Sequence, residues 1–377
     1  MTYRASVAGH ASSKPGFRLS VLDKSPLAAG ESAVDALGRS VALARAADAW
    51  GYHRYWLAEH HNTAGLACPS PEILIAHVLA HTRRIRVGSG GVMLQHYSPY
   101  KIAENFNLLA ALAPGRVDMG IGKAPGGLPL STRALQTSGE SSHRADFAEL
   151  ASALDRYLRA TDTPPAGHEG NETVLRATPL PPESASPFLL GASVDSAALA
   201  ARLGWDFVYA AHINAAAENI QQSLDRYRSA SGGRVPLLAI SVVVAPTRAE
   251  AVKLAEGFRR FRVQVGDGPA VNVGSLEQVE EFVRQSGGGA HRVEEREAHI
   301  VHGTRDEVLR ELGELQQRYG VEEFIVDTPI SAAAPRIASL RLLAGGADPS
   351  NANQSNTTLA TQAPTPIDAA HSFAPAD

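Results

Sequence analysis

The sequence is poor in the residues that build covalent or metal-based frameworks. It contains one cysteine, Cys68, among 377 residues, which excludes an intrachain disulfide and a cysteine-rich zinc site. No stretch approaches the roughly 18 apolar residues that a membrane-spanning helix needs. Residues 1–16 lack the apolar core of a secretory signal, and we therefore expect a cytoplasmic protein.

An excess of charge of one sign is missing as well. The chain has 35 Lys and Arg against 39 Asp and Glu, for a net charge of −4. A binder of nucleic acid or of an anionic membrane would show a basic excess, so neither partner is expected. Hydrophobic residues make up 44% of the chain, which is enough for the large core of an ordinary globular protein.

Two low-complexity ends flank the part of the chain that we expect to fold. Residues 1–16 are small, polar and aperiodic, and residues 345–377 are rich in Ala, Pro, Thr, Asn and Ser. Neither end carries enough large apolar residues to offset the entropy lost on ordering, so both are predicted to be disordered. The folded domain is predicted to cover residues 17–344.

Within that domain, short apolar runs alternate with amphipathic helical patterns. Repeated strand–helix units imply a parallel sheet, because parallel neighbours need a crossover helix between them. Eight units favour an α/β protein of the closed (β/α)8 TIM-barrel type over an open sheet. The predicted strands are 17–23, 53–58, 85–94, 117–121, 187–190, 205–210, 237–244 and 323–327.

Two intervals between strands are too long for a simple unit. About 65 residues separate strands 4 and 5, and about 80 separate strands 7 and 8, where a crossover needs only about a dozen. We therefore expect insertions after strands 4 and 7, and insertions of this length are often lids or binding loops. For residues 163–187, plain surface elaboration explains the length equally well.

Polar residues gather where the predicted strands end, which is where parallel barrels carry their active sites. Glu59, His60 and His61 end strand 2, and strand alternation lets at most one of the two histidines point into the barrel mouth. An imidazole there could act as a general base, or be a plain hydrogen-bonded side chain. A metal site is a further alternative, with His60, His96, His212 and Glu59 as ligands. Other residues at strand ends are Leu22, Lys24 and Asp327.

Glycines cluster at the ends of strands 3 and 4. Residues 88–91 and 120–127 match neither the dinucleotide-binding nor the nucleoside-triphosphate pattern. Glycine lets a flat ligand approach the backbone closely, and Lys123 could contact a phosphate or a carbonyl group of that ligand. Tight turns that require glycine explain both clusters equally well.

A possible anion site follows strand 5. Gly191, Ala192 and Ser193 end that strand and enter a helix that contains Ser196. The free N–H groups of a helix N-terminus, together with serine hydroxyls, bind anions. Simple N-capping by Ser193 is the alternative.

Four segments carry a resemblance to a known family. They are RLSVLDKSP (18–26), GYHRYWLAEHHN (51–62), RIRVGSGGVML (84–94) and PGRVDMGIGKAPGG (114–127). Together they resemble the luciferase-like flavin-dependent monooxygenases, in particular the single-chain bacterial subgroup, over about residues 17–344. The resemblance implies a (β/α)8 barrel that uses reduced FMN from a separate NAD(P)H:flavin reductase. It also implies oxygenation of a small organic substrate through a flavin C4a-hydroperoxide, and a homodimer.

The resemblance further implies roles for individual residues. His60 takes the position of the catalytic histidine, and Ser89-Gly90 the position of a non-prolyl cis peptide beneath the flavin ring. Leu22, His96 and His212 are expected on the substrate side. The implied cofactor-binding residues are Glu59, Ser89, Gly90, Gly91, Lys123, Gly191, Ala192, Ser193 and Ser196.

Three departures from the family pattern leave alternatives open. Lys123 replaces an Arg that contacts the flavin, Ala192 replaces a Ser that contacts the phosphate, and residues 95–97 replace Pro-Asn-His. An F420-dependent oxidoreductase that transfers a hydride is one alternative to an FMN monooxygenase. A metal-dependent hydrolase and a non-catalytic flavin-binding protein are two others.

Overall fold

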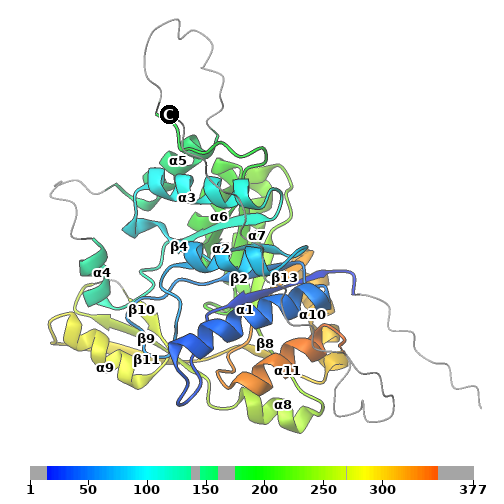
Figure 1. Ribbon diagram of the computed structural model, residues 1–377. Coiled ribbons are helices and arrows are strands. Elements are labelled where there is room, and N and C mark those ends of the chain that lie inside the picture. The colour runs from blue at the N-terminus through cyan, green and yellow to red at the C-terminus, as the bar shows by residue number, and fades with distance from the viewer. Residues whose placement is uncertain (1–14, 137–144, 160–174, 269, 347–377) are drawn as a thin grey trace, which may run out of the picture. The chain divides into compact units, whose positions relative to one another are not determined.

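The computed structural model describes residues 15–136, 145–159, 175–268 and 270–346 (Figure 1). The predicted disordered ends, 1–16 and 345–377, lie almost wholly outside the described residues. Residues 163–174 of the segment 163–187, for which surface elaboration is an alternative, also lie outside the described residues.

Eight parallel strands close into a ring, which confirms the predicted TIM barrel. The last strand pairs in parallel with β1 on one side and with β8 on the other, and β8 also pairs with β7. The ring order follows the sequence. Its strands are β1 (Arg18–Asp23), β2 (Arg54–Leu57), β3 (Arg86–Ser89), β5 (Val117–Gly122), β6 (Ser186–Gly191), β7 (Asp206–Ala210), β8 (Leu237–Val244) and β13 (Glu323–Asp327).

Helices connect the strands and begin at capping residues that the sequence displays. Ser32 caps the first helix through its side chain, and Gly51 ends that helix in the left-handed conformation at φ 83°. Thr304 and Glu307 form a capping box. The helices between barrel strands are α1 (Ala33–Trp50), α2 (Pro71–His81), α3 (Pro99–Leu112), α5 (Phe147–Leu158), α6 (Val194–Leu203), α7 (Ala217–Ser231) and α10 (Arg305–Tyr319), and α11 (Ala333–Leu343) follows β13.

The insertion after strand 7 is a small folded unit, where the sequence analysis expected a loop. Its strand β9 pairs antiparallel with two others, and an apolar cluster that includes Phe261 and Phe282 joins this sheet to a helix. The helix also contacts α4 (Pro129–Leu135) of the first insertion (Figure 1). The elements are α8 (Arg248–Ala255), β9 (Arg259–Val265), β10 (Val271–Val273), α9 (Leu276–Gln285), β11 (His291–Glu297) and β12 (Ile300–Gly303), of which β12 pairs with the end of β8.

The third predicted strand, 85–94, is interrupted. It divides into β3, β4 (Val92–Met93) and a 3₁₀ turn, η1 (Leu94–His96). Gly88 pairs with Asp118 and Val92 pairs with Ile121, so three residues of one strand face two of the other, as in a β-bulge. Glycine is required here, because a Cβ on Gly120 would lie 2.2 Å from the carbonyl oxygen of Ser89.

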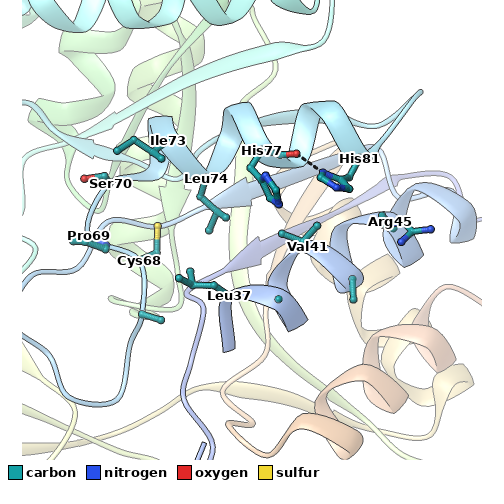
Figure 2. Close-up of a pocket in the computed structure, with 13 residues that line it drawn as sticks. Leu37, Val41, Arg45, Cys68, Pro69, Ser70, Ile73, Leu74, His77 and His81 are labelled. Carbon is teal, nitrogen blue, oxygen red and sulfur yellow. Dashed lines mark hydrogen bonds between the residues drawn. The ribbon is translucent and has the colours of Figure 1, made fainter. Parts of the chain in front are cut away.

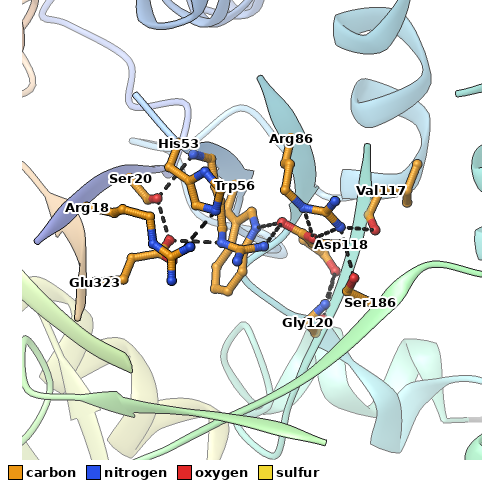
Figure 3. A network of polar contacts seen from close by, with 12 residues as sticks. Arg18, Ser20, His53, Trp56, Arg86, Val117, Asp118, Gly120, Ser186 and Glu323 are labelled. Carbon is orange, nitrogen blue, oxygen red and sulfur yellow. Dashed lines mark hydrogen bonds and ion pairs between the residues drawn. The ribbon is translucent and has the colours of Figure 1, made fainter. Parts of the chain in front are cut away.

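A layer of buried ion pairs closes the bottom of the barrel (Figure 3). The Arg54 guanidinium donates to Glu323 and to Asp118, at 2.9 Å in both cases. Arg86 donates to the other oxygen of Asp118 at 2.6 Å, and the Trp56 indole donates to Asp118 at 2.9 Å. Both carboxylates are buried. Each therefore has charged partners that offset its desolvation.

A second buried ion pair joins α11 to the end of β1. Arg336 donates from Nη2 to Oδ1 of Asp23 at 2.9 Å, and these side chains are only 2% and 1% exposed. Asp23 also accepts from the Tyr55 hydroxyl at 2.5 Å and from the backbone N–H of Ser25 at 2.9 Å. This carboxylate therefore fixes the turn by which the chain leaves β1.

Candidate functional site

Strand alternation brings polar side chains to the inner face of the barrel rim. Leu22 and Ala58 pack inside the barrel. Lys24 and His60, each two residues further along the chain, therefore face the mouth. Asp327, two residues after the interior residue Ile325, faces the mouth in the same way. With His212 after β7, these residues form what we call the polar arc: Lys24, His60, His212 and Asp327.

An ion pair lies at the centre of the polar arc. The Lys24 ammonium is 2.6 Å from Oδ2 of Asp327. Burial raises the pKa of Asp327, but the Lys24 charge outweighs that effect and holds the pKa below its usual value. Burial also lowers the pKa of Lys24, although Asp327 opposes this shift. The second carboxylate oxygen, Oδ1, is buried and has no hydrogen-bond partner among the described residues.

The two histidines of the polar arc are held neutral. Burial, reinforced by the Lys24 charge, lowers the pKa of His60 to about 4 and that of His212 to about 3. In the described part of the chain, Nδ1 of each ring is buried without a hydrogen-bond partner. A neutral imidazole can donate or accept one proton at such a nitrogen. Both rings are therefore available to a ligand.

The Glu59 side chain is turned away from the polar arc, and its expected contact with a cofactor stays a prediction. Its carboxylate is fully buried and accepts hydrogen bonds from the Tyr97 hydroxyl at 2.9 Å and the Met93 backbone N–H at 3.0 Å. It is also 2.7 Å from Nε2 of His61. As the neighbour of inward-facing His60, Glu59 points outward along the strand and braces the loops around the rim.

His96 belongs to this outer group and not to the polar arc. Its ring packs edge-on against His61, with the ring centroids 6.0 Å apart. One ring nitrogen is 2.8 Å from the carbonyl oxygen of Pro125 and the other is 3.0 Å from the side-chain amide of Gln136. The structure therefore does not bring His96 together with His60 and His212, and its role toward a substrate stays a prediction.

The remaining part of the rim is formed by glycines of β5 and β6 and of the bulge that follows β3. We call it the glycine arc: Gly90, Gly91, Gly120, Gly122 and Gly191. Leu22 lies directly beneath it, buried, and its Cδ1 would be 2.6 Å from a Cβ on Gly90. The Ser89 hydroxyl is bonded to the backbone of Gly120, at 2.7 Å to the oxygen and 3.0 Å to the nitrogen. Ser89 can therefore reach a ligand only through its backbone.

The non-prolyl cis peptide lies one residue later than the resemblance implied. It joins Gly90 to Gly91, and the bond between Ser89 and Gly90 is not among the cis bonds of the described residues. Pairing with β5 stops after Gly88 and resumes at Val92. The unpaired bulge between these points accommodates the cis bond.

The predicted anion site lies at the N-terminus of α6. Ser193 is exposed, caps the helix by accepting from the Ser196 N–H at 3.3 Å, and has its hydroxyl 3.1 Å from that of Ser196. Gly191 makes room for this turn, because a Cβ there would be 2.4 Å from the Cβ of Ser196. Ala192 is half-buried, and Lys123 is exposed at the end of β5. Ser193 can therefore cap α6 and still offer its hydroxyl to an anion.

A groove of about 660 Å³ lies elsewhere, between α1 and α2 (Figure 2). Leu37 and Val41 line it from α1, and Ile73 and Leu74 line it from α2. Cys68 is buried at one end, and burial raises the pKa of its thiol to about 12. None of the residues predicted for the site lines this groove.

Neither a metal cluster nor a membrane-spanning helix occurs among the described residues. No three His, Cys, Asp or Glu side chains among them are grouped so as to hold a metal ion. None of the helices in the described ranges is both long enough and apolar enough to cross a membrane.

Sequence reasoning gave no role to three charged residues near the mouth. Lys24 and Asp327 appear among the strand ends, but their contact depends on the pairing of β1 with β13, which the sequence does not display. Arg260 lies on β9, which was not predicted. The alternation of polar and apolar residues in RRFRVQV (259–265) could have indicated that strand.

Comparison with known proteins gives consistent results. The family model for luciferase-like monooxygenases matches residues 17–349. The N-acetyl-S-alkylcysteine monooxygenase of Bacillus subtilis is 41% identical over 333 residues, which cover 86% of this chain and 97% of that protein. The crystal structure of apo-MsnO8 superimposes with a TM-score of 0.69 at 32% identity, covering 87% of this chain and 97% of that one. The oxygenating constituent of 3,6-diketocamphane monooxygenase from Pseudomonas putida, solved with FMN, shares the fold at a TM-score of 0.61 and 17% identity, covering 87% and 97%.

Proposed function

Because the chain belongs to the luciferase-like monooxygenase family and is a monooxygenase, we propose that it binds reduced FMN at the barrel mouth and uses O2 to oxygenate a small organic substrate. The observation that carries this proposal is the division of the rim into two arcs. Going round the barrel, the glycine arc occupies β3, β5 and β6, while the polar arc occupies β7, β13, β1 and β2. A flat cofactor suits the first arc, and a reacting substrate suits the second.

The residues present fit FMN at both of its ends. The glycine arc offers backbone without side chains, which lets the face of an isoalloxazine ring approach closely. The N-terminus of α6 offers free N–H groups with the hydroxyls of Ser193 and Ser196, which suit a phosphate. Lys123, exposed at the end of β5, adds a positive charge at the same arc. When bound, the reduced flavin supplies the electrons that activate O2.

The chain's own residues hold protons and exclude water. At neutral pH the imidazole of His60 is uncharged and has a free nitrogen at the mouth, so it can accept a proton from the substrate or hold one near the reacting oxygen. Leu22 and Trp56 form a buried apolar layer beneath the mouth. The ionic layer of Arg54 and Asp118 lies below that. These two layers fill the barrel below the mouth and limit the access of water from that side.

The proposal is tested by cofactor titration and by oxygen uptake. Purified protein is expected to bind reduced FMN under anaerobic conditions, and to consume O2 and substrate when the two are mixed. N-acetyl-S-alkylcysteines are the first substrates to test, because the 41% identical relative is named for them. His60→Gln should lower kcat with little change in FMN affinity. Failure to bind FMN in either redox state would refute the proposal.

Two alternatives predict different results in the same experiments. An F420-dependent oxidoreductase would bind F420 and reduce its substrate without O2. A non-catalytic flavin-binding protein would bind FMN but show no oxygen uptake with any substrate.

We further propose that a separate NAD(P)H:flavin reductase supplies the reduced FMN and that the chain forms a homodimer. The glycine-rich strand ends lack the dinucleotide-binding pattern. The purified chain should therefore not oxidise NADH or NADPH in the presence of FMN, whereas adding a reductase should restore turnover. Light scattering should give twice the mass of one chain.

A further inference from the structure

One cation near the mouth has no counterion in the described part of the chain. Arg260 lies on β9, where Phe261 and Val263 pack on α9, so alternation turns Arg260 to the opposite face of the strand. The Arg260 side chain is half-buried, and its positive charge contributes to lowering the pKa values of Lys24, His212 and Asp327. Arg260 therefore lies within electrostatic reach of the polar arc.

Two arginines of the same small sheet have carboxylate partners, whereas Arg260 has none. Arg259 is 3.2 Å from a carboxylate oxygen of Glu295, and Arg296 is 3.0 Å from one of Glu294. In the described ranges, the side chain of Arg260 has no hydrogen bond or ion pair. Asp327 already pairs with Lys24 at 2.6 Å, so the positive charge of Arg260 remains uncompensated.

The other unpartnered groups of the polar arc complete a recognition site. Nδ1 of His60 and Nδ1 of His212 are buried without partners, and so is the acceptor Oδ1 of Asp327. Buried polar groups without partners are costly unless a ligand or water satisfies them. The free groups are thus one guanidinium, two neutral imidazoles and one carboxylate oxygen that needs a donor.

We infer that Arg260 binds the carboxylate of the substrate, and that the substrate is a small organic acid with a hydrogen-bond donor near its carboxylate. This inference rests on the proposed function, which places the substrate at the polar arc. A planar carboxylate matches the guanidinium fork and can accept two hydrogen bonds from it. The donor, an amide N–H or a hydroxyl, satisfies Oδ1 of Asp327. The imidazole of His60 then lies beside the bound acid.

The test compares an acid with its neutral analogue. N-acetyl-S-methylcysteine and its carboxamide have nearly the same shape and differ in the charge. Each is titrated by calorimetry into protein saturated with oxidised FMN, and into protein without flavin. We expect the acid to bind about 10- to 100-fold more tightly than the amide, which is the range for one partly buried charge-assisted contact.

Two matched variants locate the effect. Arg260→Gln should weaken binding of the acid about 10- to 100-fold and leave the amide unchanged. Arg262→Gln, on the same face of β9 but exposed, should change neither affinity. Equal binding of acid and amide, equal weakening of both by Arg260→Gln, or no binding of the acid at millimolar concentration would each overturn the inference.

Failure of the inference is distinguishable from failure of the proposed function. Oxygen uptake that is equal for the acid and the amide supports the monooxygenase and rejects the role of Arg260. Selective binding of the acid without any FMN binding supports the role of Arg260 and rejects the monooxygenase.

Discussion

Lowering the pH from 7 to 5 should destabilise the folded protein through two residues, His60 and His212. In the folded state their pKa values are about 4 and about 3, whereas an unfolded histidine has a pKa of about 6.5. Between these values the unfolded chain binds more protons than the folded one. The free energy of unfolding therefore falls as the pH drops through 6.5, and it is fully recovered above pH 7.

The size of this effect follows from the two pKa values of each residue. Integration from pH 7 to pH 5 gives a loss of about 2 kcal/mol for His60 and about 2 kcal/mol for His212. Asp327 does not interfere, because its lowered pKa matters only below the usual carboxylate range. Urea denaturation followed by circular dichroism at pH 7, 6 and 5 measures the total.

Variants separate these two residues from every other titrating group. His60→Gln and His212→Gln should each reduce the loss between pH 7 and pH 5 by about 2 kcal/mol. His291→Gln, which alters an exposed histidine on β11, serves as the control and should leave the loss unchanged. If His60→Gln lost stability with the same pH dependence as the native chain, the neutral, buried imidazole and its assignment as a proton acceptor would both be wrong.

Three further predictions concern the scaffold and the cofactor. Arg336→Met should lower the free energy of unfolding, measured by urea denaturation, by about 3–5 kcal/mol because it leaves Asp23 buried without its charge partner. The double variant Asp23→Asn with Arg336→Met should lose less stability than the sum of the two single changes. Additive losses would contradict the pairing. Gly120→Ala should destabilise the fold by about 1–3 kcal/mol or more because the new Cβ meets the Ser89 carbonyl. Gly313→Ala, on α10 with no atom near the new Cβ, should stabilise it by up to about 1 kcal/mol. Equal shifts of the melting temperature in the two variants would refute the close approach of β3 and β5. The double variant Ser193→Ala with Ser196→Ala should weaken FMN binding about 10-fold in a fluorescence titration. Binding of riboflavin, which lacks the phosphate, should change much less. An equal loss of affinity for both ligands would show that α6 does not bind the phosphate.

The sequence predicted the barrel well because its signals are local. Ser98-Pro99 and Gly51 define helix ends directly, and alternating strands and helices imply parallel pairing. The strand ends likewise identified His60 and His212. The direction of a side chain beyond the end of its strand could not be predicted from the sequence. Glu59 and His60 are neighbours, yet one faces outward and is fully buried by protein partners, and the other faces the mouth.

Long-range contacts account for the other differences. The pairing of Lys24 with Asp327 joins residues 303 positions apart, and no local pattern reports such a pair. The glycines at 88–91 are consistent with a tight turn or a ligand surface, and only the pairing with β5 shows a bulge. The sheet of β9, β10 and β11 was missed because its two longer strands are rich in charged residues, and they gain stability from the cluster around Phe261 that forms only in the folded unit.

The unequal rim bears on how new substrate preferences can arise in this chain. On the glycine arc, Gly91 and Gly120 each have backbone atoms within 3 Å of where a side chain would begin, so these positions tolerate few substitutions. The polar arc and β9 present side chains that can be exchanged without moving a strand. Natural drift or a laboratory library would therefore change specificity most readily through His212 and Arg260. The opposite arc, which we propose as the cofactor surface, would stay constant.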